Sequence, residues 1–230
     1  KGKFQVLSLD FSQVVGCADN LQDAFHVYLG IKIDAFLRKY GKYYSQKAIE
    51  AAHNAPTAGG KIAAFVGEAK EKGYQLYLII DEYDNFTNVV LNEQGHDVYH
   101  EMTHGSGFYR DVFKTFKPNF TRILFMGVSP ITLDDLTSGF NIATNISVHY
   151  WFNNLLGFSE TDVREMIRYY QEVGRITKPE DEIIAEMKPW YDNYCFSVEC
   201  YGVEPCMYNS NMVIYYMNTL ITTGRPPKDM

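Results

Sequence analysis

The 230-residue sequence has no long hydrophobic run, no excess of basic residues and few cysteines. Its longest apolar stretches, such as Leu76–Ile80 and Ile123–Met126, are far too short to cross a bilayer, so we expect no membrane association. Lysine and arginine total 21 against 28 acidic residues, which argues against a nucleic-acid-binding surface. The four cysteines form no CxxC pair and no secretion signal is visible, so we expect reduced thiols and a cytoplasmic location.

What the sequence does contain is a globular balance, with 46% hydrophobic, 15% aromatic and 21% charged residues. This composition excludes intrinsic disorder, and the length suits one sizeable domain or a core with a small lid. Both ends of the chain are abrupt. A strand-like apolar segment begins at Phe4, and the sequence stops shortly after the loop-like Gly224–Pro227. We therefore expect a piece of a longer protein, with a processed or tagged chain as the alternative.

Hydrophobic periodicity predicts strands that alternate with helices. Short apolar runs predict strands at Phe4–Ser12, Gln75–Asp81, Thr121–Val128 and Ile146–Val148. Apolar residues at helical spacing predict helices at Asn20–Tyr40, Gln46–His53, Lys61–Lys72, within Gly95–Phe116, and at Ser159–Val173, Glu180–Lys188 and Asn209–Leu220. This alternation is typical of an α/β domain with a parallel sheet. We expect an α/β core at residues 1–150 and a mostly helical lid subdomain at residues 151–230.

The strongest local signal is LYLIIDEYD at Leu76–Asp84, an apolar strand that ends in acids, as a Walker B element does. Open parallel sheets bind ligands at the carboxyl ends of their strands. There Asp81 would hold Mg²⁺ against nucleotide phosphates, directly or through water. Glu82 would be the catalytic base that polarises the attacking water. The alternative interpretation is that acids follow the strand only because loops are polar.

A second predicted strand, ILFMGVSPIT, leads to Ser129. At the same edge of the sheet this hydroxyl would contact the γ-phosphate or position water. The sequence lacks a P-loop, which is a glycine, any four residues and then Gly-Lys-Ser/Thr after a strand. The nearest string is APTAGGKI at Ala55–Ile62, which has neither the first glycine nor the hydroxyl residue. We interpret it as a flexible loop and a helix start.

A competing motif is HEMTH, which matches the HExxH pattern of zinc hydrolases. His100 and His104 would be zinc ligands one helical turn apart, with Glu101 as the general base. The longer HExxHxxGxxH pattern fails because Arg110 stands at the third ligand position. The simpler interpretation of these histidines, together with His96, is one polar helix face.

The matching stretches LYLIIDEYDNFTN, GFYRDVFK, FMGVSPITLDDLTSGFNIATNIS, LGFSETDV and KPWYDNYCFS resemble the bacterial AAA-ATPase-like family of predicted P-loop ATPases. The resemblance implies a P-loop NTPase-like parallel sheet with flanking helices, here without its P-loop strand, followed by the helical lid. By position it makes Asp81 and Glu82 the Walker B pair and Ser129 the sensor. Met126 stands where many members have threonine, so the resemblance gives that position no role.

The family also implies ATP and Mg²⁺ as cofactors of the intact protein, with little or no binding by this chain. Members often carry a nuclease-like domain downstream, through which alone nucleic acid would be contacted. The absent P-loop strand would leave one edge of the strand Thr121–Val128 open. We expect another segment, a protein partner or self-association to cover it. Two alternatives to an ATPase stay open: a non-catalytic interaction module of the same fold, and the zinc hydrolase.

Overall fold

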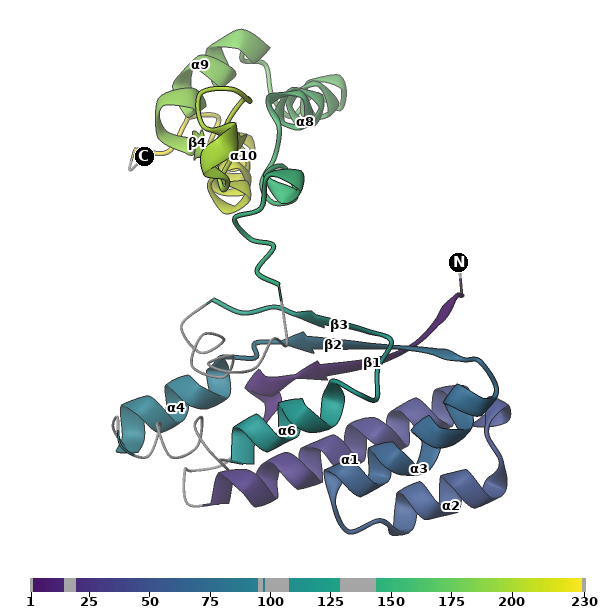
Figure 1. Cartoon of the computed structure of the whole chain (residues 1–230). Helices are drawn as coiled ribbons and strands as arrows, with labels where there is room; N and C mark the ends of the chain where they lie inside the picture. The colour runs from purple at the N-terminus through teal and green to yellow at the C-terminus, as the bar shows by residue number, and fades with distance from the viewer. Residues whose placement is uncertain (1, 15–19, 95–96, 98–107, 129–143, 229–230) are drawn as a thin grey trace. The chain divides into compact units, whose positions relative to one another are not determined.

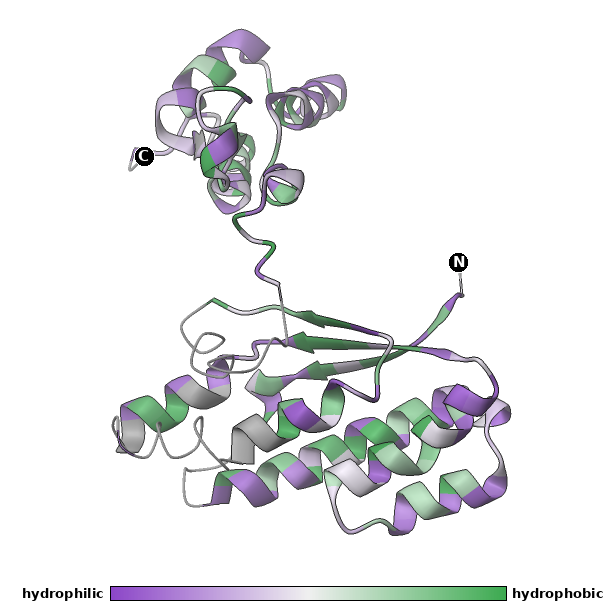
Figure 2. Cartoon of the chain, in the orientation of Figure 1, coloured by the Kyte–Doolittle hydropathy of each residue, from purple (hydrophilic) through white to green (hydrophobic). Residues whose placement is uncertain are grey.

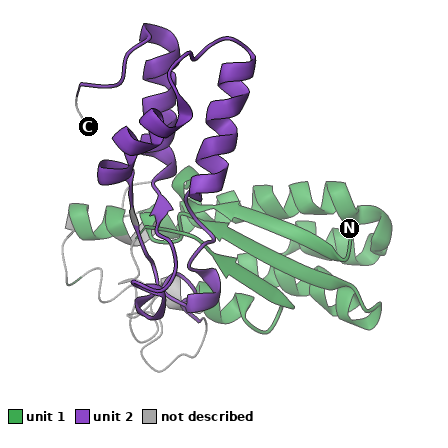
Figure 3. Ribbon diagram, turned by 90° about the horizontal axis from the view of Figure 1, so that it is seen from above, with its two compact units in different colours: residues 1–142 green, residues 143–230 purple. Residues whose placement is uncertain are grey.

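The computed structural model divides the chain into two compact units, residues 1–142 and 143–230 (Figure 3). It describes residues 2–14, 20–94, 97, 108–128 and 144–228. The sequence predicts this boundary at residue 150. The short helix η4 (Tyr150–Phe152) contacts η5 (Val198–Cys200), so the segment just before residue 151 belongs with the C-terminal unit.

Unit 1 is built on a parallel sheet of three strands in the order β1-β2-β3. The strands are β1 (Phe4–Asp10), β2 (Gln75–Asp81) and β3 (Arg122–Phe125). The register aligns Asp10 with Asp81 and Leu78 with Ile123. Parallel strands need long crossover connections, and the helices between these strands provide them. The predicted α/β architecture with a parallel sheet flanked by helices is confirmed.

The two faces of the sheet are buried unequally. Leu7 and Leu9 of β1 and Leu76, Leu78 and Ile80 of β2 are almost inaccessible to solvent. Because successive side chains of a strand alternate between faces, their neighbours in sequence lie on the other face, where Val6, Tyr77 and Ile79 are only partly buried. The buried face is the one that carries the helices (Figure 1), and the hydrophobic residues of Figure 2 concentrate on the strands and the facing helices.

Five α-helices of unit 1 are described: α1 (Leu21–Tyr40), α2 (Gln46–Asn54), α3 (Ala58–Glu71), α4 (Asn85–Gln94) and α6 (Phe108–Phe116). Side-chain caps determine where two of them begin. Ser45 accepts the N–H of Ala48 in α2, and Thr57 accepts the N–H of Gly60 in α3. Such caps satisfy backbone donors that have no partner inside the helix. The predicted helix at Lys61 therefore begins earlier, at Ala58.

Unit 2 has its own core. It contains α8 (Glu160–Glu172), α9 (Glu180–Tyr191) and α10 (Ser210–Thr223), with a small antiparallel pair, β4 (Asp192–Tyr194) and β5 (Met207–Tyr208). The buried side chains that form this core are Val163, Ile167, Ile176, Ile183, Ile184, Met187, Tyr191, Tyr208, Val213, Tyr216, Met217 and Leu220. A capping box between Ser159 and Asp162 begins α8, at the serine that the sequence predicts. The role of this unit as a lid stays a prediction.

Two strand predictions need correction. Residues 146–148 form a turn instead of a strand, because the side chain of Asn145 accepts the N–H of Ser147 and so favours a local turn over a ladder. The strand predicted at Thr121–Val128 is shorter, Arg122–Phe125, and beyond it Met126 bonds to Ile80 near the end of β2 and to Tyr83 in the loop that follows. By contrast, β2 has the predicted bounds Gln75–Asp81. Among the described helices, none combines the length and the apolarity that crossing a membrane requires.

Candidate active site

Asp81 and Glu82 lie at the carboxyl end of β2, the central strand of the sheet. The Asp81 side chain is exposed, and its Oδ1 accepts the backbone N–H of Glu82 at 3.0 Å. Glu82 has a φ of 51°, and it is the one non-glycine residue in the described part with a positive φ. The left-handed region costs an L-residue about 1–2 kcal/mol, and such strain clusters at functional sites. The sequence gives no signal for this conformation.

The loop after β2 is hydrogen-bonded to the segment that follows β3. Met126 donates its N–H to the carbonyl of Ile80 at 2.8 Å, and Tyr83 donates its N–H to the carbonyl of Met126 at 3.1 Å. Two strand ends that are 40 residues or more apart in sequence therefore meet here. Ser129, the predicted sensor, lies outside the described residues, one position beyond Val128.

Asp84 and Gly127 make the closest contact between these two segments. Asp84 is buried, with 1% of its surface exposed, and its Oδ2 accepts the N–H of Val128 at 3.1 Å. A Cβ atom on Gly127 would lie 2.3 Å from Asp84 Oδ1 and 2.7 Å from the Tyr83 ring, so only glycine fits. Sequence reasoning missed both residues. The available signal was a further acid three positions after Asp81 and a glycine just after the next strand.

Asp10 places another carboxylate at the same edge, since it is the register partner of Asp81. Its oxygens are already engaged: Oδ1 accepts the N–H and hydroxyl of Ser12, and Oδ2 accepts the amide of Gln13. These hydrogen bonds, with a smaller contribution from nearby Lys32, hold the pKa of Asp10 below its ordinary value. Asp10 therefore anchors the turn after β1, and Asp81 is the exposed acid of the pair.

The donor set at this edge suits Mg²⁺. Carboxylate oxygens are hard ligands, and Mg²⁺ in nucleotide sites is held by one or two carboxylates together with phosphate oxygens and water. The described residues contain no group of three or more His, Cys, Asp or Glu side chains placed to hold a metal by themselves. Asp81 alone thus fits a shared ion better than a metal held entirely by protein. The alternative zinc ligands His100 and His104, with Glu101, lie outside the described residues, and that hypothesis stays a prediction.

The Gly59-Gly60-Lys61 string lies in the first turn of helix α3 and is not arranged as a phosphate loop. The Lys61 ammonium donates to the carbonyls of Ala52 and His53, both at 3.1 Å, at the end of α2. A lysine at this position satisfies terminal carbonyls and complements the helix dipole. Lys61 therefore joins α2 to α3, and the string is a helix start, as predicted, within a capped helix.

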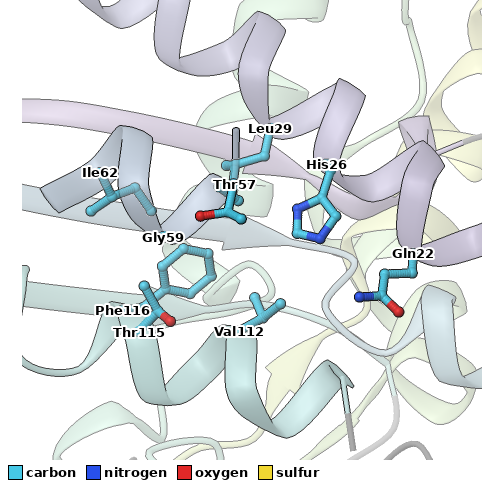
Figure 4. A pocket seen from close by; sticks show the side chains of 10 residues that line it. Gln22, His26, Leu29, Thr57, Gly59, Ile62, Val112, Thr115 and Phe116 are labelled. Atoms are coloured by element: carbon cyan, nitrogen blue, oxygen red, sulfur yellow. The ribbon is translucent and has the colours of Figure 1, made fainter. Parts of the chain in front are cut away.

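The helical layer holds a pocket of about 380 Å³ between α1, α3 and α6 (Figure 4). The polar side chains of Gln22, His26, Thr57 and Thr115 line it together with apolar ones. No acid is among its lining residues. This pocket is thus separate from the acidic edge that Asp81 and Glu82 form.

In unit 2 the arginines of α8 are paired with acids. Arg164 bonds to Glu160, Glu180 and Asp181, and Arg168 bonds to Glu180. The hydrogen bonds from Arg168 and Arg164 lower the pKa of Glu180 to about 2. These guanidinium groups link α8 to α9, which is a structural use of charge.

Residues 1–137, more than half of the chain, match a protein family described as AAA-ATPase_like, predicted AAA-ATPase. The matched range contains all three strands of the sheet and both acids at the end of β2. It ends before unit 2 begins. No curated protein and no solved structure matches the chain.

Proposed function

Because this chain belongs to the AAA-ATPase-like family, we propose that unit 1 carries the acidic half of an ATP-hydrolysis site. In the intact protein Asp81 holds Mg²⁺, directly or through water, and Glu82 is the catalytic base that takes a proton from the attacking water. Ser129 contacts the γ-phosphate. When bound, Mg²⁺ neutralises charge on the phosphate oxygens. The observation that carries the proposal is the exposed carboxylate of Asp81 at the end of the central strand, directly followed by the strained Glu82.

The two acids are suited to different tasks. Asp81 is exposed, and its Oδ1 already accepts a backbone N–H, which leaves Oδ2 as the oxygen for a hydrated cation. Glu82 is partly buried, and a longer side chain reaches further from the strand end. A base must come within about 3 Å of the proton that it accepts. We assign the ion to the fixed aspartate and the water to the longer glutamate.

The proposal assigns phosphate binding to a segment outside these 230 residues. The sequence has no P-loop, and Lys61 is engaged at the end of α2. In the described part, β3 pairs only with β2, and its second edge has no described strand partner. We propose that this edge receives a strand from another segment or another chain. The 230-residue chain by itself would then bind Mg·ATP weakly or not at all.

The test of the proposed function is Glu82→Gln in the intact protein. Glutamine keeps the shape but cannot accept the proton, so we expect ATP turnover to be abolished while Mg·ATP affinity stays within about twofold. Glu71→Gln, at an exposed acid at the end of α3, is the matched control and should leave both unchanged. Unaffected turnover in Glu82→Gln would remove the assigned role. Absence of ATP binding by the intact protein would favour the interaction module instead.

A further inference from the structure

We infer that Asp84 is a positioning residue, which holds the segment after β3 against the acid loop after β2. The inference rests on the proposed function, since it concerns the geometry of that site. Asp84 touches no reacting atom. It acts through the backbone of Gly127 and Val128, which it holds against the loop that carries Glu82.

The segment after β3, residues 126–128, is not held in place by buried side chains. Met126 is 40% exposed, Val128 is 85% exposed and Gly127 has no side chain. Hydrophobic burial therefore contributes little to the placement of this segment. Its described hydrogen bonds to β2 and to the loop after β2 are the backbone bonds of Met126 with Ile80 and Tyr83, and the bond from Val128 N–H to Asp84 Oδ2.

Among the described hydrogen bonds of this segment, the bond to Asp84 is the one made by a side chain. It is also the last one along the segment before Ser129. Asp84 is buried at 1% exposure, and a buried carboxylate is tolerated only when hydrogen bonds compensate its lost hydration. A hydrogen bond to a charged group contributes more to stability than one between neutral groups. The acid is thus a strong and specific anchor for this backbone.

The contact between Asp84 and Gly127 adds a steric restraint. Gly127 lies so close to Asp84 that a Cβ atom would be 2.3 Å from Oδ1 and would also meet the Tyr83 ring. The carboxylate therefore contacts the segment at two adjacent residues, one through a hydrogen bond and one through packing. A contact of this kind restricts the segment in two directions, whereas a single hydrogen bond restricts only one distance.

A purely structural alternative has to be separated from this role. Asp84 directly precedes α4, and its carbonyl accepts the N–H of Asn88, so the acid also stands at a helix N-cap position. Serine caps helices about as well as aspartate, but its hydroxyl is too short to reach Val128. Asparagine keeps both the cap and an oxygen that accepts the Val128 N–H. Asp84→Ser therefore loses the contact to Val128 and Asp84→Asn keeps it, while both variants keep the helix cap.

The experiment measures two quantities. Amide hydrogen exchange of Val128, in the 230-residue chain without nucleotide, reports the contact itself. Turnover and KM for ATP, in the intact protein, report its consequence. For Asp84→Ser we expect Val128 exchange to accelerate at least tenfold and kcat to fall about 10- to 100-fold at unchanged KM, because small displacements of catalytic groups have costs of this size. Asp84→Asn should keep Val128 exchange and kcat close to their wild-type values, and Glu71→Gln should change neither quantity.

Other results would overturn the inference or the proposed function. Fast exchange of Val128 in the wild-type chain, or equal exchange in wild type and Asp84→Ser, would show that the contact is absent and overturn the inference. Accelerated exchange with unchanged kcat would mean that the contact exists but positions nothing, which also overturns it. If the wild-type intact protein does not turn over ATP, the proposed function fails first, and the exchange data show separately whether Asp84 holds the segment.

Discussion

The hydroxyl of Tyr28, in α1, accepts a hydrogen bond from the backbone N–H of Asp10 at 2.6 Å. Tyr40 of the same helix does the same for Val6 at 3.2 Å. Both N–H groups point away from β2, so two tyrosines close the outer edge of β1. Open sheet edges invite pairing with other chains. The two edges of the sheet thus differ, because the closed one is β1, and β3 has no second strand in the described part.

Replacing Tyr28 with phenylalanine removes the acceptor and leaves a backbone donor at the edge of β1. We expect the free energy of unfolding of unit 1 to fall by about 1–2 kcal/mol, since an unsatisfied buried donor costs about 1–3 kcal/mol and this one is partly solvated. Urea unfolding followed by far-UV circular dichroism measures it. Tyr43→Phe, at a more exposed tyrosine, should change stability by less than about 0.5 kcal/mol. Equal effects at both positions would contradict the role of Tyr28.

Gly127→Ala adds one methyl group where Asp84 Oδ1 would be 2.3 Å away. Overpacking of a fitted site costs about 1–3 kcal/mol, so we expect a lower urea midpoint. Gly67→Ala is the matched control, because it lies inside α3 and an added Cβ there meets nothing within 4 Å. Alanine should raise stability there by about 0.5–1 kcal/mol. The same sign of change at both glycines would argue against the close contact.

Low pH should lower the stability of unit 2 by protonating Glu180. Its pKa is lowered from 4.5 to about 2 in the folded chain, so its stabilising effect is present above pH 4.5 and is lost as pH falls toward 2. Both tryptophans, Trp151 and Trp190, belong to unit 2, so their fluorescence follows its unfolding. We expect the urea midpoint to fall between pH 6 and pH 3, and to fall less in Glu180→Gln. Equal falls in both proteins would contradict this assignment.

The two cores should unfold as separable units. Leu78 has 0% exposure in unit 1, and its replacement by alanine costs about 2–5 kcal/mol in comparable cores. The buried residues of the two units form distinct clusters. We therefore expect Leu78→Ala to lower the urea midpoint of the unfolding transition seen by circular dichroism, while the midpoint of the tryptophan fluorescence transition stays unchanged. A joint shift of both signals would show that the units unfold as one.

The strands and most helices could be predicted because their signals are local. Gln75–Asp81 is a continuous apolar run between polar residues, and such a run predicts a buried parallel strand whatever surrounds it. Ser159 and Asp162 have capping-box spacing, which depends on four residues only. The strand prediction for residues 146–148 is wrong because a segment of three residues is too short to outweigh the turn that Asn145 favours.

The sequence by itself determined that an apolar strand delivers Asp81 and Glu82 to one edge of a parallel sheet, because burial of an alternating or continuous apolar run needs no knowledge of distant residues. Only the tertiary structure decided that Asp84 meets Gly127 and Val128, residues more than 40 positions away, and that Glu82 takes a left-handed backbone. The physical reason is that these features depend on how two strand ends pack together. A contact between residues that are far apart in the sequence leaves no periodic pattern in it. A strained backbone conformation persists only where surrounding contacts compensate the strain.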